Sequence, residues 1–150
     1  MLLERLQGKE RVYLDSAAVI YFIERHPTYL SLLRPLFEWV DRGIITGLSS
    51  YLTMLEVMVK PLMQGRLDLA EEYRATLIES PNLFLFPMEE SVARKGAEIR
   101  AGFNIETPDA IQLATAELRG ADYFITNDRK LKRFNRVEVL ILDDFVQTTS

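Results

Sequence analysis

The segment Ala121-Asp122-Tyr123-Phe124-Ile125-Thr126-Asn127-Asp128 predicts a short buried strand, Tyr123–Thr126, with an aspartate on each side of it. The segment Val12-Tyr13-Leu14-Asp15 has a similar form, because its apolar run ends on an aspartate. Short apolar runs bounded by turn-forming residues are typical of strands that are buried on both faces. The two segments therefore predict strands of a parallel sheet, with Asp15 and Asp128 at their carboxyl ends.

Predicted helices and strands alternate along the rest of the chain. The strands are expected at about 11–15, 44–48, 83–86, 123–126 and 138–142, and the helices at about 17–24, 29–42, 50–63, 67–79, 88–103 and 107–119. Ser49 or Ser50 is expected to cap the third helix. Thr107 is expected to cap the last helix, with Pro108 at its first position and Gly120 just past its end. This alternation predicts an α/β fold, a three-layer α/β/α arrangement around a parallel sheet of about five strands.

The composition is that of one globular domain spanning residues 1–150. Hydrophobic residues make up 48% of the chain and charged residues 27%, and no apolar run is long enough for a membrane span. The N-terminal segment does not resemble a secretory signal. There is no cysteine, which excludes disulfides and thiolate metal sites. We therefore expect a cytoplasmic protein that is not associated with a membrane.

Four acidic residues are candidates for one active site. In parallel sheets, ligands bind beyond the carboxyl ends of the strands, where Asp15 and Asp128 are expected. Asp122 precedes its strand and is therefore expected at the opposite edge. Glu56 interrupts an otherwise apolar helix, in which a buried glutamate is costly unless it is paired. Asp109 lies in the first turn of the last long helix.

Each acid taken alone also has a simpler explanation. Asp15 and Asp128 are suited to capping the helical turns that follow them, and a helix dipole favours Asp109. Glu56 is spaced for an ion pair with Lys60. Together, however, clustered carboxylates repel by roughly 4 kcal/mol per pair at 4 Å, for a dielectric constant near 20. A divalent cation relieves this repulsion, and carboxylate oxygens suit Mg²⁺ or Mn²⁺ better than zinc.

Other sequence features narrow the chemistry. The chain has one histidine, His26, and neither a GxxxxGK[ST] loop nor a GxGxxG motif, so imidazole-based sites and P-loop chemistry are disfavoured. A basic run follows Asp128 and is expected to form a short helical turn; its members are Arg129, Lys130, Lys132, Arg133 and Arg136. Such a run is either a solvated surface or a contact for phosphates. Metal-assisted attack of water on a phosphodiester is the reaction these features favour.

Four segments, in their order along the chain, resemble the PIN-domain family, and especially the VapC-like toxin ribonucleases of prokaryotic toxin–antitoxin pairs. They are Val12–Ser16, Ser50–Glu56, Thr107–Ala116 and Ala121–Asp128. The resemblance implies an Mg²⁺- or Mn²⁺-dependent endoribonuclease whose metal ligands are Asp15, Asp109, Glu56 and Asp128. It further implies supporting roles for Thr126 and Ser16, an RNA substrate, a cognate antitoxin and a homodimer. The position of the basic run beside Asp128 makes Arg129, Lys130, Lys132 and Arg133 candidates for contact with the RNA backbone.

Two other functions remain open on the sequence. One is a DNA-directed nuclease, and the other is a non-catalytic RNA-binding or scaffold module that keeps the acids only for structure. The sequence gives a weaker indication of a dimer, because helices 50–79 carry more large apolar residues than one face needs. These residues are Tyr51, Met54, Met58, Met63 and Tyr73. Ordinary core packing explains them slightly better.

Overall fold

The computed structural model describes residues 2–146 and contains a central sheet of five parallel strands. The sheet order is β3-β2-β1-β4-β5. The strands are β1 (Arg11–Leu14), β2 (Thr46–Ser50), β3 (Leu83–Phe86), β4 (Tyr123–Thr126) and β5 (Glu138–Ile141). The strands β2 and β3 follow β1 in sequence and lie on one side of it, whereas β4 and β5 lie on its other side. The point between β1 and β4 is therefore a topological switch point, where α/β sheets bind ligands.

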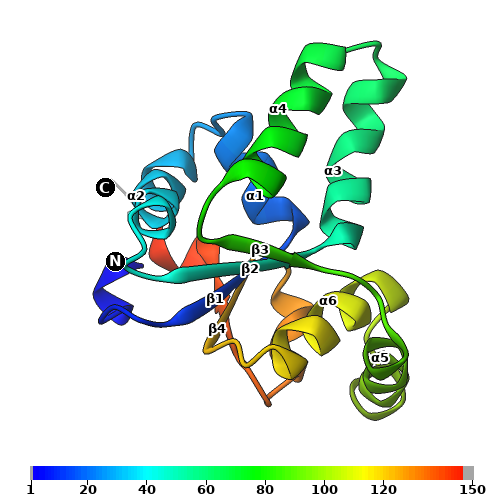
Figure 1. Ribbon diagram of the computed structural model, residues 1–150. Coiled ribbons are helices and arrows are strands. Elements are labelled where there is room, and N and C mark those ends of the chain that lie inside the picture. Colours follow the sequence, from blue (N-terminus) through cyan, green and yellow to red (C-terminus); the bar gives the residue numbers. More distant parts are fainter. Residues whose placement is uncertain (1, 147–150) are drawn as a thin grey trace.

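Helices cover both faces of this sheet (Figure 1). One face carries α1 (Ser16–Ile23), α2 (Leu30–Asp41), α3 (Tyr51–Met63) and α4 (Leu67–Glu79); the other carries α5 (Glu90–Phe103) and α6 (Thr107–Leu118). The described residues also contain three short 3-10 turns: η1 (Leu3–Arg5), η2 (Arg129–Arg133) and η3 (Leu142–Phe145). Across residues 2–146, none of the helices is long and apolar enough to cross a membrane. The three-layer α/β/α prediction is confirmed.

Alternating side chains on the strands separate two hydrophobic cores. On β1, Leu14 packs with the core under α1–α4, whereas Tyr13 packs with the core under α5 and α6. On β4, Ile125 packs with the core under α1–α4 and Phe124 with the core under α5 and α6. Tyr13 stacks on Phe124, with ring centroids 5.0 Å apart. Because the central strands are buried on both faces, they lack the polar–apolar alternation of a half-exposed sheet.

Several predicted boundaries were wrong by one or two residues, and the largest differences are in the second strand and at the start of α5. The second strand is Thr46–Ser50 rather than 44–48, and α5 begins at Glu90 rather than at residue 88. In α6, Glu106 occupies the N-cap position without a side-chain hydrogen bond, so Thr107 is the first helical residue and not the cap. The cap of α3 is Ser50, whose hydroxyl accepts a hydrogen bond from the Thr53 amide at 3.3 Å.

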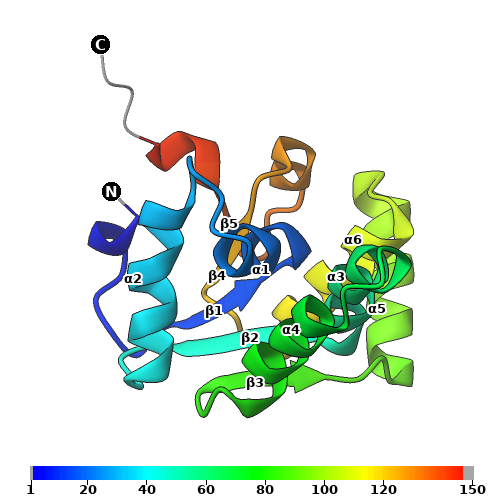
Figure 2. The ribbon, with the colours of Figure 1, turned by 90° about the horizontal axis from the view of Figure 1, so that it is seen from above.

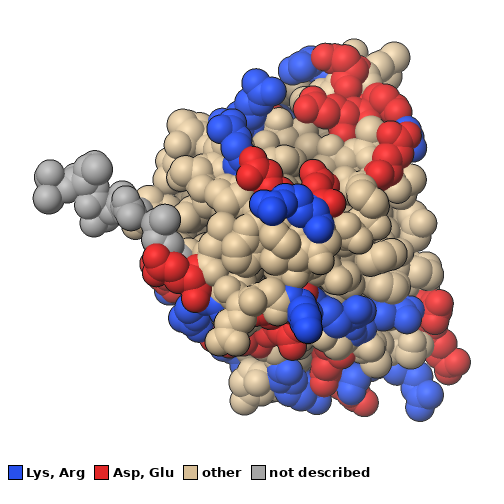
Figure 3. Space-filling model, turned by 60° about the vertical axis from the view of Figure 1, so that its left-hand side comes forward, with Lys and Arg blue, Asp and Glu red and all other residues tan. Residues whose placement is uncertain are grey.

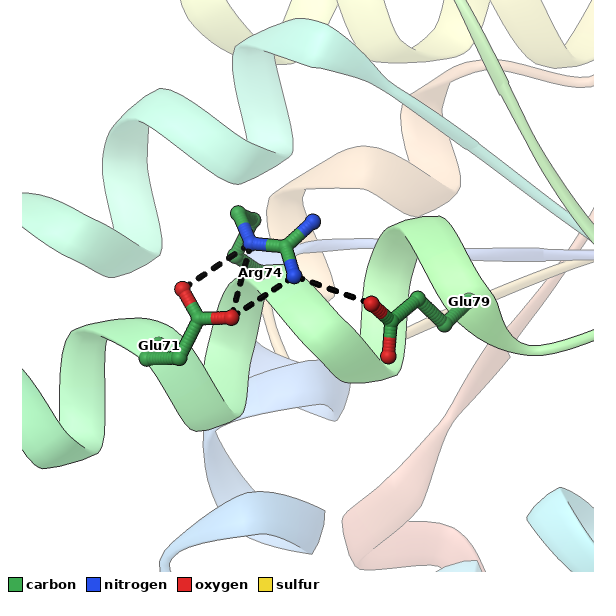
Figure 4. Close-up of polar contacts among 3 residues, drawn as sticks. All are labelled: Glu71, Arg74 and Glu79. Atoms are coloured by element: carbon green, nitrogen blue, oxygen red, sulfur yellow. Dashed lines mark hydrogen bonds and ion pairs between the residues drawn. The ribbon is translucent and has the colours of Figure 1, made fainter.

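The described surface mixes both signs of charge. Figure 3 shows one face on which basic and acidic side chains are interspersed with uncharged ones. On α4, Arg74 pairs with Glu71 at 2.6 Å and with Glu79 at 3.0 Å, as Figure 4 shows. Such exposed pairs contribute little to stability, typically below about 1 kcal/mol each. Function must therefore be sought at a local site rather than in a uniform surface field.

Candidate active site at the β1–β4 switch point

Asp15 is the most buried acid of the predicted site. It follows the last residue of β1 and is only 8% exposed. Its Oδ1 accepts a hydrogen bond from the Ala18 amide at 3.0 Å, so it is the N-cap of α1. The capping explanation is thus confirmed for Asp15. One carboxylate oxygen is sufficient for this cap, and the residue also lines the pocket described next.

A pocket of about 400 Å³ lies beyond the carboxyl ends of β1 and β4. The side chains around it come from the two strand ends and from α1, α3 and α6. They are Asp15, Ser16, Ala17, Tyr21, Glu56, Asp109, Gln112, Thr126, Asn127 and Asp128. The structure therefore brings together all four predicted acids and both predicted supporting hydroxyls. Asp122 is absent from this pocket and instead accepts a hydrogen bond from the Arg11 amide at 2.8 Å, at the opposite edge of the sheet.

Glu56 is held by a buried polar network rather than by Lys60. Its Oε1 accepts hydrogen bonds from the Ser16 hydroxyl at 2.8 Å and from Gln112 Nε2 at 3.0 Å. The Oε1 of Gln112 in turn accepts from the Tyr13 and Thr53 hydroxyls, both at 3.0 Å. No ion pair joins Glu56 to Lys60 among residues 2–146, so the i,i+4 explanation was wrong. This network fixes the Glu56 carboxylate at the pocket wall.

Thr126 and Asp128 form the β4 side of the pocket. Thr126 is fully buried as the last residue of β4, and its hydroxyl accepts a hydrogen bond from the Asp128 amide at 3.1 Å. Asp128 is exposed, and its Oδ1 accepts from the Lys130 amide at 3.0 Å, which caps η2. The capping explanation therefore also holds for Asp128. In both aspartates the cap and the pocket position occur together.

The electrostatics of the pocket disfavour ionised acids. Burial raises the pKa of Asp15 from 3.8 to about 7, with smaller contributions from the negative charges of Asp109 and Glu56, while Thr126 opposes the rise. Burial likewise raises the pKa of Asp109 to about 6, and the charges of Asp128 and Glu56 add to this effect. The negative charge of each carboxylate thus makes ionisation of its neighbours less favourable.

The donor set fits a hard divalent cation in its chemistry. Carboxylate oxygens from Asp15, Glu56 and Asp109 face one pocket, with no competing thiolate in the chain. Within residues 2–146, however, no group of three acidic or histidine side chains already stands close enough together to ligate one ion. The carboxylates would have to turn toward a common point, and one oxygen of Asp128 is already used by the Lys130 amide in the cap of η2.

The sequence argument missed Ala17 and three polar pocket residues, Gln112, Asn127 and Tyr21. Gln112 is buried and links Glu56 to Tyr13 and Thr53. Asn127 is clamped from both ends, because its Nδ2 donates to the Tyr29 hydroxyl at 2.9 Å and its Oδ1 accepts from the Asp143 amide at 3.0 Å. Tyr21 stacks on Tyr29, with ring centroids 4.4 Å apart. A glutamine inside the apolar run Ile111–Ala114 was the one available signal for Gln112.

The predicted basic run forms η2 and the loop after it, but its members lie in different surroundings. Arg129 pairs with Asp144 of η3 at 2.7 Å, and Arg136 pairs with Glu117 of α6 at 3.1 Å. Lys130 and Arg133 line a hollow beside the acidic pocket, whereas Lys132 borders a separate one. Figure 2 shows the orange turn η2 between the red η3 and the yellow α6.

The switch-point pocket agrees with a comparison to protein families. The family model described as PIN domain matches residues 12–137, which include every pocket residue. The chain belongs to the PIN domain family. No curated protein matches this PIN domain in a sequence search.

Solved structures share the fold of this PIN domain at low sequence identity. A chain of VapBC2 from Rickettsia felis, bound to a promoter DNA fragment, aligns with TM-score 0.65 and 18% identity over 87% of this chain and 98% of that one. A chain of DNA-bound VapBC from Salmonella typhimurium aligns with TM-score 0.66 and 17% identity, over 89% of this chain and 98% of that one. A chain of FitAcB from Neisseria gonorrhoeae aligns with TM-score 0.64 and 20% sequence identity, over 87% of this chain and 97% of that one.

Proposed function

We propose that this protein is an Mg²⁺- or Mn²⁺-dependent endoribonuclease and the toxin of a toxin–antitoxin pair. The observation that carries the proposal is the convergence of four carboxylates, distant in sequence, on one pocket at the switch point of a PIN domain. Similar chains occur in VapBC and FitAB-type complexes, which supports the toxin assignment. The sequence prediction of RNA as the substrate is part of this proposal.

The roles of the residues follow from their positions. Asp15, Asp109, Glu56 and Asp128 would hold the metal, which when bound activates water and neutralises charge on the phosphate. Ser16 and Gln112 orient Glu56 through their hydrogen bonds to Oε1. Thr126 supports Asp15 and orients Asp128 through the Asp128 amide. With its pKa raised to about 7, the Asp15 carboxyl is partly protonated at neutral pH, and the protonated fraction would lose its proton when a cation binds.

The direct test is cleavage of single-stranded RNA by the purified protein with Mg²⁺ or Mn²⁺. We expect EDTA or Asp15→Asn to abolish cleavage, because either removes the metal or a carboxylate that would hold it. Asp122→Asn is the matched control, because it changes an aspartate at the opposite edge of the same sheet. Cleavage that survives both EDTA and Asp15→Asn contradicts the proposal.

The same assay separates the two other functions. A DNA oligonucleotide of identical sequence, cut as fast as the RNA, would indicate a DNA-directed or general nuclease. RNA binding without cleavage under any metal condition would indicate a non-catalytic module. The four acids favour catalysis, since clustered carboxylates that serve no metal destabilise the fold.

The toxin assignment has its own test. A short neighbouring reading frame that encodes a DNA-binding protein is expected, and its product should co-purify with this chain and block cleavage. The DNA in the VapBC structures supports a partner of this class. If the protein inhibits growth when expressed and no neighbouring product relieves the inhibition, the toxin–antitoxin pairing is wrong although the nuclease remains.

A further inference from the structure

A second hollow lies directly beside the acidic pocket. Its volume is about 210 Å³, and it shares Asp109 and Asp128 with the larger pocket. These two carboxylates therefore form a common wall between the hollows. The other lining residues come from the end of α5, the start of α6 and η2: Asn104, Ile105, Glu106, Lys130, Leu131 and Arg133. A polymer bound at the acidic pocket would reach this hollow next.

The geometry of η2 decides which basic side chains face the hollow. A 3-10 helix has three residues per turn, so side chains three apart eclipse each other. Lys130 and Arg133 consequently share one face, and Arg129 and Lys132 share another. The third face belongs to Leu131, which is 2% exposed and anchors the turn in the core. The burial of Leu131 thus fixes the direction of the basic side chains.

The two faces differ in what their charges already contact. Arg129 is committed to Asp144, with Nη2 2.7 Å from Oδ1, and Lys132 borders a hollow near β5. Lys130 has no salt bridge among residues 2–146, yet its charge lowers the pKa of Asp109 against the larger upward effect of burial. Arg133 donates one hydrogen bond, from Nη1 to the Asn104 carbonyl oxygen at 2.9 Å. A guanidinium has five N–H donors, so donors remain for a ligand.

We infer that Lys130 and Arg133 form a binding site for the RNA phosphate next to the one that is cleaved, and that Arg129 and Lys132 do not. This inference rests on the proposed nuclease function. Of the basic run, it assigns only the residues on one face of η2 to RNA binding. The acids on the common wall would be committed to the metal, which leaves Lys130 and Arg133 with one opposing carboxylate, that of Glu106, and hence a net positive charge for the neighbouring phosphate. Phosphate contacts of this kind position a strand without reading its sequence.

The test measures how RNA binding depends on salt. The full chain carries Asp15→Asn so that the RNA stays intact, and Asp15 does not line the second hollow. A fluorescent single-stranded RNA is titrated in Mg²⁺ at several NaCl concentrations, and affinity is followed by anisotropy. Loss of one phosphate contact on single strands changes the slope of log affinity against log salt by about 0.7, which at 0.1 M salt is roughly a five-fold weaker affinity.

We expect Lys130→Ala and Arg133→Ala each to reduce the slope by that amount, and Lys130→Arg to retain it. Lys132→Ala is the matched control, because it removes the same side chain from the same turn on another face. Arg129→Ala is a second control. All four side chains are exposed, so thermal melts should show that each variant folds.

Two results would overturn the inference. Either Lys132→Ala reduces the slope as much as Lys130→Ala, which means that only overall charge matters, or Lys130→Ala and Arg133→Ala both leave the slope unchanged. If the wild-type protein still cleaves RNA, either result removes the phosphate site alone. A wild-type protein that neither binds nor cleaves RNA removes the proposed function as well.

Discussion

At the residue scale, Asp15 links the site to the stability of the fold. Its carboxyl has a pKa of about 7 in the folded protein against an ordinary value of 3.8. Between these two values the folded chain binds more protons than the unfolded chain, so stability falls as the pH rises from 4 toward 7, and it stays low above 7. Each pKa unit corresponds to about 1.4 kcal/mol, so the loss is on the order of 4 kcal/mol.

We therefore predict that metal-free Asp15→Asn is more stable than the wild type at pH 8, and that the two differ little at pH 4. Asparagine caps helices as well as aspartate does, so the variant keeps the cap of α1. Urea unfolding at a series of pH values measures the difference. Asp41→Asn, at an exposed carboxylate of α2, should show no such pH-dependent gain. Equal stability of Asp15→Asn and wild type at pH 8 would contradict the prediction.

Gln112 carries a second residue-scale prediction. Gln112→Leu preserves size but leaves the buried Tyr13 and Thr53 hydroxyls without their acceptor. Each unsatisfied group costs about 1–3 kcal/mol, so the free energy of unfolding should drop by several kcal/mol. Thr115→Val, on the same helix, removes only a bond to the Ile111 carbonyl oxygen and is the control. Equal losses in the two variants would show that the Gln112 network has no special role.

At the element scale, the two roles of Asp128 in η2, as a cap and as a pocket carboxylate, can be tested separately. Asp128 caps the turn through the Lys130 amide, and its carboxylate also lines the acidic pocket. Serine is as good a cap as aspartate but is a weak metal ligand. We predict that Asp128→Ser keeps the thermal stability of the wild type while its RNA cleavage falls by at least an order of magnitude. Asp128→Ala should lose cleavage and also some stability. Full cleavage by Asp128→Ser would assign Asp128 to capping alone.

The elements also show where sequence reasoning succeeds and where it stops. Apolar runs such as Tyr123–Thr126 predicted their strands correctly, because burial on both faces leaves a continuous apolar pattern. The C-terminal half of β2 was missed, because Ser49 and Ser50 are polar although they are buried. The Ser49 hydroxyl donates to the Leu14 carbonyl oxygen at 2.8 Å, a partner that lies 35 residues away. Local sequence does not contain that partner.

Two acids of the candidate site, Asp15 and Asp128, were predictable from strand ends, whereas the supporting residue Asn127 was not. Asp15 and Asp128 follow from the rule for parallel sheets, which needs only the order of elements. Asn127 becomes recognisable only when Tyr29 and Asp143 are placed beside it. The division of the basic run likewise depends on the 3-10 geometry of η2, since the sequence predicts a short turn but not its period.

At the scale of the whole molecule, α3 presents an uncovered apolar stripe. Tyr51, Leu55 and Val59 recur at intervals of four residues, and Leu62 and Met63 continue the same stripe; each is at least 45% exposed. Of the residues that indicated a dimer in the sequence, Tyr73 is fully buried and Met54 and Met58 pack on the core. Tyr51 and Met63 remain. The homodimer therefore stays a prediction, now based on a different set of residues.

We predict that the protein sediments as a dimer at micromolar concentration and that Leu55→Lys together with Met63→Lys shifts it to monomer, because charged groups at an apolar interface cost several kcal/mol. Leu118→Lys is the control, at an exposed leucine on the opposite side of the sheet. A wild-type protein that sediments only as monomer would show that the stripe does not mediate self-association.

The order of strands has one more consequence, which concerns synthesis on the ribosome. The pocket needs both β1, which ends before Asp15, and β4, which is followed by Asp128 more than 100 residues later. A nascent chain cannot assemble the pocket until β4 has left the exit tunnel. If the protein cuts RNA, the pocket therefore cannot act on the messenger or the ribosome until residues 12–128 have been synthesised. Because β4 must pair with β1, the activity would begin only after β4 has been synthesised and has folded.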